Sequence, residues 1–449
     1  MIIRVYQLIS SLAGVLGWPL FYYHLRSRGQ GESFLPRLGL RPPPPPPVGS
    51  PRIWIHGVSV GEILAAVPLV EELKALLPRS AVIISTGTET GQALARQHFL
   101  PLEAVVCYFP LDLPWAVSQA FTVLRPDIFV ALESEVWPNF LTTASRRGVS
   151  LALMNARLSD RSFRRYLHYK RYLYDIINLI EVIAAGSRQD YRRFADLGLP
   201  GHKLFLTGNL KVDALLNRRR QKSLSSPPPL SEAVSGALTG ANQKCRSLEE
   251  TLALRGEPVF LAASTHPGEE EVVLTAYEAL RGPYPALLLI LAPRHPDRAP
   301  AVGDLLARKG LGFQRWQSLQ SGAEVRQQPV VLVDTVGDLF GLYAAADVAF
   351  VGGSLVPHGG QNILEPAVWG LAPLYGPHIE NFRWAEEILQ GAGVGTVVRD
   401  APSLAAAARQ LLENPSERRR LGEAAQAALG SHQGAARRQA ELVSKLARI

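Results

Sequence analysis

Cysteine is almost absent from this sequence, since the 449 residues include only Cys107 and Cys245. Two cysteines cannot build a disulfide framework or a cysteine-rich zinc site. No His-x-x-x-His pair or other metal-ligand spacing occurs, so we expect no metal and no cofactor. Short-period repeats are missing, which excludes solenoid folds. No recognisable nucleic-acid-binding motif is present, so nucleic acid is not an expected partner.

The sequence does contain enough apolar residues for large cores, together with an excess of positive charge. Hydrophobic residues make up 47% of the chain, and its length allows two domains with additional segments. The formal net charge is +8. This charge favours an anionic partner, such as a lipid headgroup or a phosphate.

The N-terminal segment is predicted to be an uncleaved membrane anchor over residues 1–28. Residues 5–24 carry no formally charged side chain, and a stretch of this length can span a bilayer as a helix. More basic residues follow this run than precede it, which places the rest of the chain in the cytoplasm. A cleaved signal peptide is disfavoured because its small-residue cleavage pattern is missing. A helix that lies in the membrane interface remains an alternative.

After the anchor, short apolar runs alternate with helical patterns, which is typical of doubly wound parallel sheets. Two such stretches are separated by a region rich in arginine, proline and serine, so we expect an α/β protein with two domains. The predicted divisions are an anchor (1–28), a proline-rich spacer (29–50), an N-terminal domain (51–215), a linker or insertion (216–256), a C-terminal domain (257–430) and a final helix (431–449).

Strands are predicted wherever a short run of β-branched and apolar residues is bounded by turn residues. In the N-terminal domain these runs lie at residues 53–55, 82–85, 105–108, 128–132, 151–155, 182–185 and 204–207. In the C-terminal domain they lie at residues 259–262, 287–292, 330–333, 348–351 and 373–375. Helices are expected at residues 63–77, 90–98 and 402–447.

The most informative segment is residues 350–367, where a buried strand breaks at Gly352 and Gly353. A helix is predicted to begin at Asn362. Its free N–H groups and positive dipole end would suit a phosphate. Glu365, one turn into this helix, is placed to accept hydrogen bonds from ribose hydroxyls. The alternative is a tight turn that Asn362 merely caps.

A second strand-to-helix turn lies at residues 54–62 of the N-terminal domain. Ser59 is expected to cap the helix, and Gly61 permits the sharp turn. Glu62 would lie near the helix start, where a carboxylate can take a proton from an attacking hydroxyl. The alternative is that Glu62 only complements the helix dipole. The same segment fits Gly-x-Ser-x-Gly, but a hydrolase elbow needs preceding strands that are missing here.

Further polar residues follow other predicted strands, at the carboxyl edge where parallel sheets bind ligands. Glu133 and Glu135 end one strand, although solvated loop acids are an equally good interpretation. Arg157 follows another strand and could hold an anionic acceptor. Lys211, near the predicted hinge, could reach a phosphate.

In the C-terminal domain, two strand exits carry candidate phosphate ligands. Ser264 and Thr265 open a helix whose N–H groups could bind phosphate oxygens. Arg294 follows the next strand and suits bidentate binding of a phosphate or carboxylate. For Asp334, after a third strand, a helix-capping role is favoured.

Several of these motifs, in this order, resemble the family of 3-deoxy-D-manno-octulosonic acid (Kdo) transferases of Gram-negative lipopolysaccharide synthesis. The segments that carry the resemblance are residues 55–62, 133–139, 155–159, 208–211 and 352–366. It extends from the anchor to about residue 400. The resemblance implies a GT-B fold, in which two Rossmann-like domains face a cleft.

The resemblance also implies an inverting transfer of Kdo from CMP-Kdo to a lipid A precursor (lipid IVA) at the cytoplasmic face of the bacterial inner membrane. Glu62 matches the catalytic base. The residues expected on the CMP-sugar side are Ser264, Thr265, His266, Arg294, His295, Gly352, Gly353, Ser354, Asn362, Glu365 and Lys211. Those expected on the acceptor side are Ser59, Gly61, Glu133, Glu135 and Arg157. The alternatives are a membrane-associated GT-B transferase that uses a UDP-sugar, and a non-catalytic scaffold that binds lipid or nucleotide.

Overall fold

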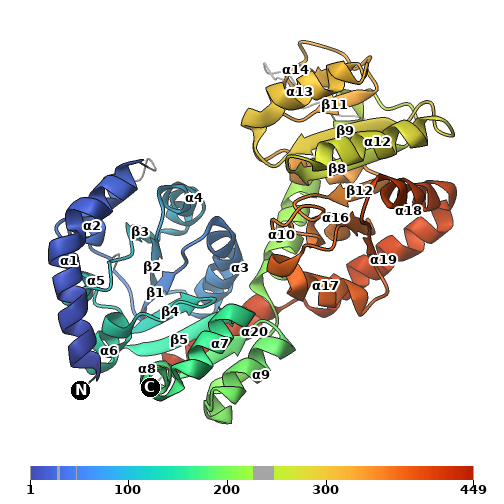
Figure 1. Ribbon diagram of the computed structural model, residues 1–449. Coiled ribbons are helices and arrows are strands. Elements are labelled where there is room, and N and C mark those ends of the chain that lie inside the picture. The colour runs from blue at the N-terminus through green and yellow to red at the C-terminus, as the bar shows by residue number, and fades with distance from the viewer. Residues whose placement is uncertain (1, 28–30, 47, 226–246, 448–449) are drawn as a thin grey trace, which may run out of the picture. The chain divides into compact units, whose positions relative to one another are not determined.

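The computed structural model describes residues 2–27, 31–46, 48–225 and 247–447. The chain forms two compact units: the first comprises Met1–Ala214 and His432–Ile449, and the second comprises Leu215–Ser431. Each unit contains one seven-stranded sheet with helices around it (Figure 1). The paired strands are parallel throughout both sheets, so the predicted doubly wound α/β class is confirmed for each unit.

The first sheet has the strand order β3-β2-β1-β4-β5-β6-β7. Its strands are β1 (Arg52–His56), β2 (Ala81–Thr86), β3 (Val105–Tyr108), β4 (Ile128–Leu132), β5 (Ser150–Ala156), β6 (Val182–Ala185) and β7 (Leu204–Leu206). The helices of this unit, or beginning in it, are α1 (Ile2–Ser27), α2 (Phe34–Arg37), α3 (Val60–Leu76), α4 (Glu89–Phe99), α5 (Pro114–Leu124), α6 (Pro138–Arg146), α7 (Asp160–His168), α8 (Lys170–Ile177), α9 (Arg188–Asp196), α10 (Leu210–Ser225) and α20 (Ala435–Leu446).

The second sheet has the strand order β10-β11-β9-β8-β12-β13-β14. Its strands are β8 (Val259–Thr265), β9 (Leu288–Pro293), β10 (Phe313–Arg315), β11 (Val330–Leu332), β12 (Val348–Val351), β13 (Pro373–Tyr375) and β14 (Thr396–Val397). The helices are α11 (Leu248–Thr251), α12 (Glu269–Arg281), α13 (Ala299–Arg308), α14 (Trp316–Gln320), α15 (Leu339–Leu342), α16 (Leu364–Val368), α17 (Arg383–Gln390), α18 (Ala401–Glu413) and α19 (Pro415–Ser431).

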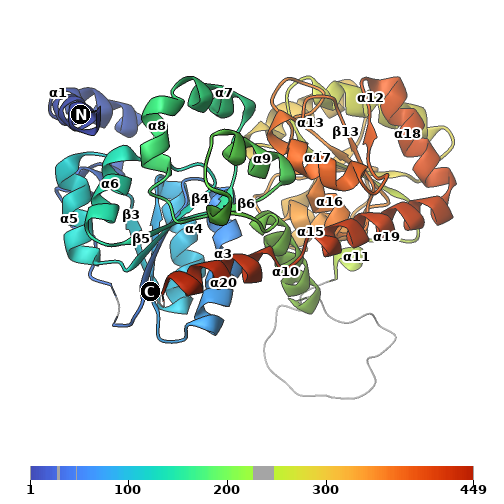
Figure 2. The same ribbon diagram turned by 90° about the horizontal axis from the view of Figure 1, so that it is seen from below.

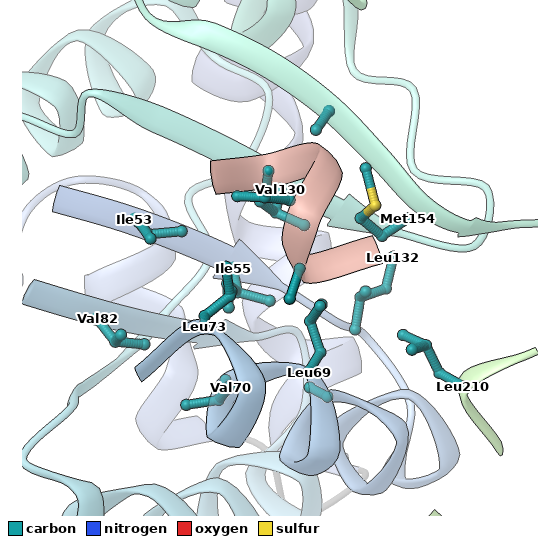
Figure 3. Packing of buried hydrophobic residues seen from close by; sticks show 14 of the residues in the cluster. Ile53, Ile55, Leu69, Val70, Leu73, Val82, Val130, Leu132, Met154 and Leu210 are labelled. Carbon is teal, nitrogen blue, oxygen red and sulfur yellow. The ribbon is translucent and has the colours of Figure 1, made fainter. Parts of the chain in front are cut away.

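The core of the first unit explains why its strands have uninterrupted apolar sequences. Every residue of β2 and β4 is buried, because helices cover both faces of the parallel sheet. On one face, Leu69 and Leu73 of α3 pack against Ile55 of β1 and Val130 of β4 (Figure 3). Removing a buried leucine from such a cluster costs about 2–5 kcal/mol, so this packing fixes α3, whose first turn carries Glu62.

The C-terminal helix α20 belongs to the first unit, although the preceding helix belongs to the second. It packs along α3 and runs to the C-terminus (Figure 2). Asp213 of α10 caps its N-terminus: Oδ1 accepts a hydrogen bond from Gly434 N at 2.8 Å, and Oδ2 accepts one from Ala436 N at 2.7 Å. A carboxylate is favourable here because the first N–H groups of a helix lack partners within the helix.

We therefore expect Asp213→Ala to loosen α20. Two N–H groups would lose a largely buried carboxylate partner, at a cost of about 1–3 kcal/mol. Hydrogen–deuterium exchange of α20 would measure this as faster exchange across the helix. Asp213→Asn keeps one acceptor oxygen and should have an intermediate effect. Unchanged exchange in Asp213→Ala would show that α20 is held by its apolar face alone.

Helix α1 corresponds to the predicted anchor. Within the described residues, no helix combines the length and apolar content needed to cross a membrane, so the predicted spanning anchor is not supported. Polar contacts attach α1 to the first unit: Tyr6 donates a hydrogen bond to Asp112 Oδ2 at 3.0 Å, and Asn139 Nδ2 donates one to Ser10 Oγ at 3.0 Å. Its placement beside α5 and α6 is visible in Figure 1.

Three segments differ locally from the sequence expectations. α2 lies within the predicted spacer at 29–50. Residues 216–225 of the predicted linker continue α10, while residues 226–246 lie outside the described part of the chain. The helix expected to begin at Asn362 begins at Leu364 instead, with Ile363 as its N-cap. This helix, α16, is only five residues long. Its dipole is therefore weaker than a long helix would provide.

Candidate functional site

Two sets of polar side chains lie at the points where the strand order of each sheet reverses direction. In the first sheet this point falls between β1 and β4, and in the second it falls between β8 and β12. Open α/β sheets bind ligands beyond the carboxyl ends of such strands. Glu62 and Glu133 follow the first pair of strands, and residues 266 and 352–355 follow the second pair.

Glu62 is held tightly at the start of α3. The predicted Ser59 cap is observed: Ser59 Oγ accepts from Glu62 N at 3.2 Å and donates to Glu62 Oε1 at 2.9 Å. Val58 N donates to Glu62 Oε2 at 2.7 Å, and the side chain is only 8% exposed. Gly61, next to it, lies against the Lys211 side chain. The carboxylate therefore has a fixed position and little contact with water.

The surroundings of Glu62 adjust its pKa. Burial raises the pKa of the Glu62 carboxyl, and the nearby charge of Glu133 raises it further. Hydrogen bonds from Val58 and Ser59 and the charge of Lys211 act in the opposite direction. A carboxylate whose pKa is raised toward neutrality is a better proton acceptor, which is what a general base requires.

Glu133 and Lys211 form an ion pair beside Glu62. Lys211 Nζ contacts Glu133 Oε1, and the two side chains are 22% and 14% exposed. Lys211 is positioned through Asn155, whose Oδ1 accepts from Leu210 N at the start of α10 at 2.9 Å. The structure thus brings Glu133 and Lys211 to Glu62, although the sequence placed Lys211 on the CMP-sugar side.

Glu135 lies in the same acidic group, next to a buried histidine. Burial raises the pKa of Glu135 to about 7, although Trp137 Nε1 donates a hydrogen bond to its Oε2 at 2.6 Å. His56 Nε2 lies 4.0 Å from the same oxygen. Burial lowers the pKa of His56 to about 3, so this imidazole is neutral, and its ring stacks on Phe109 with centroids 3.7 Å apart.

Arg157 reaches the same edge of the sheet through its backbone. Its N–H donates to Glu133 O at 3.0 Å, which connects the ends of β4 and β5. Burial raises the pKa of Asp190, and the nearby charge of Arg157 opposes this rise. Arg157 thus lies near both the carboxylates and Asp190.

The strand ends in both units contain backbone strain that the sequence did not reveal. Glu133, Asn155 and Ser264 have positive φ values of 61°, 50° and 54°. Non-glycine residues adopt this region at a cost, and such strain is concentrated at functional sites. At Ser264 the strand register also shifts, which redirects the following side chains toward the carboxyl edge of the second sheet.

In the second unit, the glycine-rich segment binds a carboxylate of the chain itself. Glu269 Oε2 accepts from Gly353 N at 2.7 Å, and Oε1 accepts from Ser354 N at 2.9 Å and from Leu355 N at 2.8 Å. Gly353 and Ser354 were predicted on the CMP-sugar side, and their N–H groups are occupied by a fully buried carboxylate of the chain itself.

The hydroxyl of Thr265, predicted to bind phosphate, and that of Ser354, expected on the CMP-sugar side, are also engaged internally. Thr265 Oγ1 donates to Glu270 Oε1 at 2.9 Å, and Thr265 is fully buried. Ser354 Oγ donates to Val351 O at 2.5 Å and accepts from Gly376 N at 2.8 Å. Both hydroxyls therefore stabilise the ends of the strands.

Histidines and an arginine of the second unit are further candidate ligands for an anion. The ring of His266 stacks on that of His358 with centroids 4.4 Å apart, and His295 lies 6.1 Å from His266, edge to face. Burial lowers the pKa of His266, and the charges of His358, His295 and Arg294 lower it further, against the opposing effect of Glu269. His358 also lies within the glycine-rich segment, but no local pattern marked it as a candidate residue.

Glu365 lies near Arg294 in the same unit. Burial raises the pKa of Glu365, whereas the charges of Arg218 and Arg294 lower it. Arg218 comes from α10 and stacks over Phe340 at 4.2 Å. Asn362 accepts from Leu364 N at 3.1 Å and so supports the short helix that carries Glu365. Arg218 was missed because it falls within the predicted linker.

Among the described residues, no group of three or more histidine, cysteine, aspartate or glutamate side chains has the arrangement of a metal site. The two polar sets differ in charge. The first combines the carboxylates of Glu62, Glu133 and Glu135 with one lysine. The second combines histidines and an arginine with the carboxylate of Glu365.

Comparison with known proteins gives consistent results. A profile of the family 3-Deoxy-D-manno-octulosonic-acid transferase (kdotransferase) matches residues 32–214. The 3-deoxy-D-manno-octulosonic acid transferase of Haemophilus influenzae is 36% identical over 401 residues, covering 89% of this chain and 87% of that protein. The transferase of the same name from Bordetella pertussis is 34% identical over 425 residues, covering 92% of each chain.

A solved structure shows the same two-domain fold at low identity. The UDP-GlcNAc 2-epimerase of Neisseria meningitidis, bound to UDP-GlcNAc, has a TM-score of 0.59 at 14% identity. The match covers 88% of this chain and 99% of that chain. At this level of identity the likeness concerns the fold alone, and it agrees with the predicted GT-B class.

Proposed function

Because the chain belongs to the family of 3-deoxy-D-manno-octulosonic acid (Kdo) transferases, we propose that it transfers Kdo from CMP-Kdo to a lipid A precursor, with inversion at the anomeric carbon. The observation that carries this proposal is the buried Glu62 at the start of α3, whose pKa is raised by burial. In this mechanism Glu62 Oε2 or Oε1 removes the proton of an acceptor sugar hydroxyl. The resulting oxygen attacks the anomeric carbon of Kdo.

The donor is assigned to the second unit because of its cationic group. CMP-Kdo carries a phosphodiester and a carboxylate, both of which are anionic. His266, His295, His358 and Arg294 supply positive charge or hydrogen-bond donors for them. When the bond to the anomeric carbon breaks, the phosphate gains charge, and preorganised donors of this kind stabilise that charge. Glu365 is assigned to the ribose hydroxyls, as the sequence motif suggested.

A lipid acceptor is supported by the exposed face of α1. Val5, Leu8, Ile9, Leu12, Val15 and Leu16 are each more than half exposed. Their spacing of three and four residues puts them on one side of the helix, while Tyr6 and Ser10 attach the other side to the unit. This combination is typical of a helix that lies in a membrane interface rather than across it. We therefore propose that the protein binds the cytoplasmic face of the inner membrane through α1.

The basic helix α7 supports the same orientation. Arg161, Arg164 and Arg165 are exposed on it, and the adjoining α8 exposes Arg171. α6 packs against both α1 and α8, so the apolar and basic surfaces belong to neighbouring elements of the first unit (Figure 2). Anionic headgroups attract such residues with about 1 kcal/mol for each lysine or arginine.

Membrane binding through α1 gives a quantitative prediction. Leu12→Ser combined with Leu16→Ser should reduce binding to vesicles of phosphatidylethanolamine and phosphatidylglycerol by about 100-fold or more, because each leucine contributes about 1.5–3 kcal/mol when buried. A vesicle co-sedimentation assay measures this. Val336→Ser changes an exposed apolar residue of the second unit in the same way and serves as the matched control. Equal binding by all three proteins would exclude α1 as the contact.

The transferase activity is tested by incubating the protein with CMP-Kdo and a tetraacylated lipid A precursor and measuring the product mass. We expect the acceptor mass to increase by one or more Kdo units, which also counts the additions. UDP-N-acetylglucosamine in place of CMP-Kdo should give no product. Transfer from the UDP-sugar alone, or no transfer from CMP-Kdo by the folded protein, would refute the proposed donor.

A further inference from the structure

The segment that joins β12 to α16 is organised around an anion that the chain supplies itself. Four backbone N–H groups converge on the Glu269 carboxylate: those of Gly353, Ser354 and Leu355, and that of His266 at 2.9 Å. Consecutive N–H groups arranged in this way form a concave anion-binding nest. Because Glu269 is fully buried, its carboxylate is bound entirely by protein groups.

The geometry leaves no room for a second anion at this position. A Cβ on Gly352 would lie 2.7 Å from Glu269 Oε2 and 2.7 Å from Ser264 O. Gly353 has a φ of +65°, which directs its N–H toward the carboxylate at no steric cost. The two glycines are therefore explained by the close approach of the Glu269 side chain, which lies 84 residues before Gly353 in the sequence.

The carboxylate connects the exits of β8 and β12. His266 N belongs to the first exit and residues 353–355 to the second, and all bond to the same side chain. The rings of His266 and His358, which stack on each other, are carried by these same two segments. Glu269 thus binds both of the segments that carry the two imidazoles.

We propose that Glu269 is a positioning residue for the donor: it holds the two strand exits together so that His266 and His358 present a preformed site to the anionic part of a cytidine nucleotide. Glu269 does not contact the nucleotide, and it acts through the two histidines. The proposal rests on the proposed function, since it takes the ligand to be a CMP-sugar. In this proposal His266 and His358 bind the donor, and Glu269 arranges these two histidines.

Glu269→Gln is the direct test. An amide supplies one acceptor oxygen and one NH₂ group, so at least two of the N–H donors would face another donor. We expect the dissociation constant for CMP, measured by isothermal titration calorimetry, to rise about 10- to 100-fold. In the transfer assay, the KM for CMP-Kdo should rise while kcat changes little, because Glu62 belongs to the other unit. Amide exchange at residues 353–355 should accelerate.

Two neighbouring glutamates provide matched controls. Glu270 is also buried, but it accepts hydrogen bonds from Arg298 Nη1 at 2.6 Å and from Thr265 Oγ1 instead of from the N–H groups of residues 353–355. Glu270→Gln should lower the thermal unfolding midpoint and leave CMP affinity unchanged. Glu271 is exposed in the same turn, and Glu271→Gln should change neither quantity. Equal loss of CMP affinity in the Glu269 and Glu270 variants would indicate a general effect of stability and overturn the proposal.

If Glu269→Gln does not fold, Gly352→Ala tests the same contact from the other side. It leaves Glu269 intact but places a methyl group 2.7 Å from Glu269 Oε2 and equally close to the backbone atoms Ser264 O and Thr265 Cα. It should therefore push the two strand exits apart and cause the same loss of CMP affinity. Wild-type affinity in either folded variant would overturn the positioning role. If the wild type itself binds no CMP, the proposed donor is wrong. In that case, hydrogen–deuterium exchange of the amides of residues 353–355 in the Glu269→Gln variant still decides whether Glu269 orders the segment between β12 and α16.

Discussion

Glu62→Gln is expected to lower kcat for Kdo transfer by about 10²–10⁴-fold, the usual contribution of a general base. Glutamine keeps the size of the side chain and one acceptor oxygen for the hydrogen bonds from Val58 and Ser59, but it cannot take up the proton of the acceptor hydroxyl. Donor binding should be retained, because the groups assigned to CMP belong to the second unit. The measurement is kcat by product mass, combined with CMP titration.

The control for this variant is Glu71→Gln, a change of the same type on the exposed side of α3. It should leave both kcat and CMP affinity unchanged. If Glu62→Gln retained full turnover, Glu62 would not be the base. If it lost CMP binding in parallel with turnover, its role would be in the integrity of the fold instead of in proton transfer.

The second large effect concerns the Glu133–Lys211 pair, whose two charges act on Glu62 in opposite directions. Lys211→Met removes a positive charge that lowers the pKa of Glu62, so this pKa should rise. Activity requires the ionised base, so the fall of kcat/KM on the acid side should move to higher pH. Glu133→Gln removes a charge that raises the pKa of Glu62, so the same fall should move to lower pH.

Both single variants should also lose activity at the pH optimum, by about 10-fold or more. Each leaves the partner's charge without its counter-ion in a largely buried position, and breaking such a pair is costly. The double variant Lys211→Met/Glu133→Gln removes both charges and should recover part of the loss. The profile of kcat/KM against pH is the deciding measurement, since it reports the pKa values of the free enzyme. Shifts of both single variants in the same direction would contradict this electrostatic account.

The sequence predicted most of the fold because the relevant signals are local. Strands such as β2 and β4 are buried on both faces, and their uninterrupted apolar runs identify them. β10 and β14 were not predicted, because they have only three and two residues and are partly or fully exposed, so no apolar run marks them. The start of α16 was predicted two residues too early, because the capping tendency of Asn362 does not by itself fix which residue begins a short helix.

The first candidate site was also largely predictable, because it depends on short spacings. Ser59 and Glu62 lie three residues apart at a strand-to-helix turn, and this spacing produces the observed cap and the hydrogen bonds to the carboxylate. Glu133 follows a strand next to β1, so the parallel order of the sheet places it beside Glu62. The partner of Glu133 could not be predicted, because Lys211 reaches it from a helix far along the chain.

The second site shows where local patterns are insufficient. The sequence pattern predicted a phosphate site at the start of the helix that follows Gly352 and Gly353, and the structure shows the Glu269 carboxylate bound at the glycine turn itself. A sequence pattern specifies which N–H groups a turn can expose, and it does not specify what occupies them. The stacking of His266 on His358 likewise joins residues that are distant in the sequence.

The sequence by itself determined the two parallel α/β sheets, the cap that holds Glu62 and the apolar character of the N-terminal helix, because burial pattern and capping act over a few residues. Tertiary structure alone decided that α1 attaches by its polar side and exposes its apolar side, that α20 returns to the first unit, and that Glu269 fills the glycine-rich turn. These features depend on contacts between distant segments, whose energies are set by packing and hydrogen bonding in the folded chain and leave no periodic signal in the sequence.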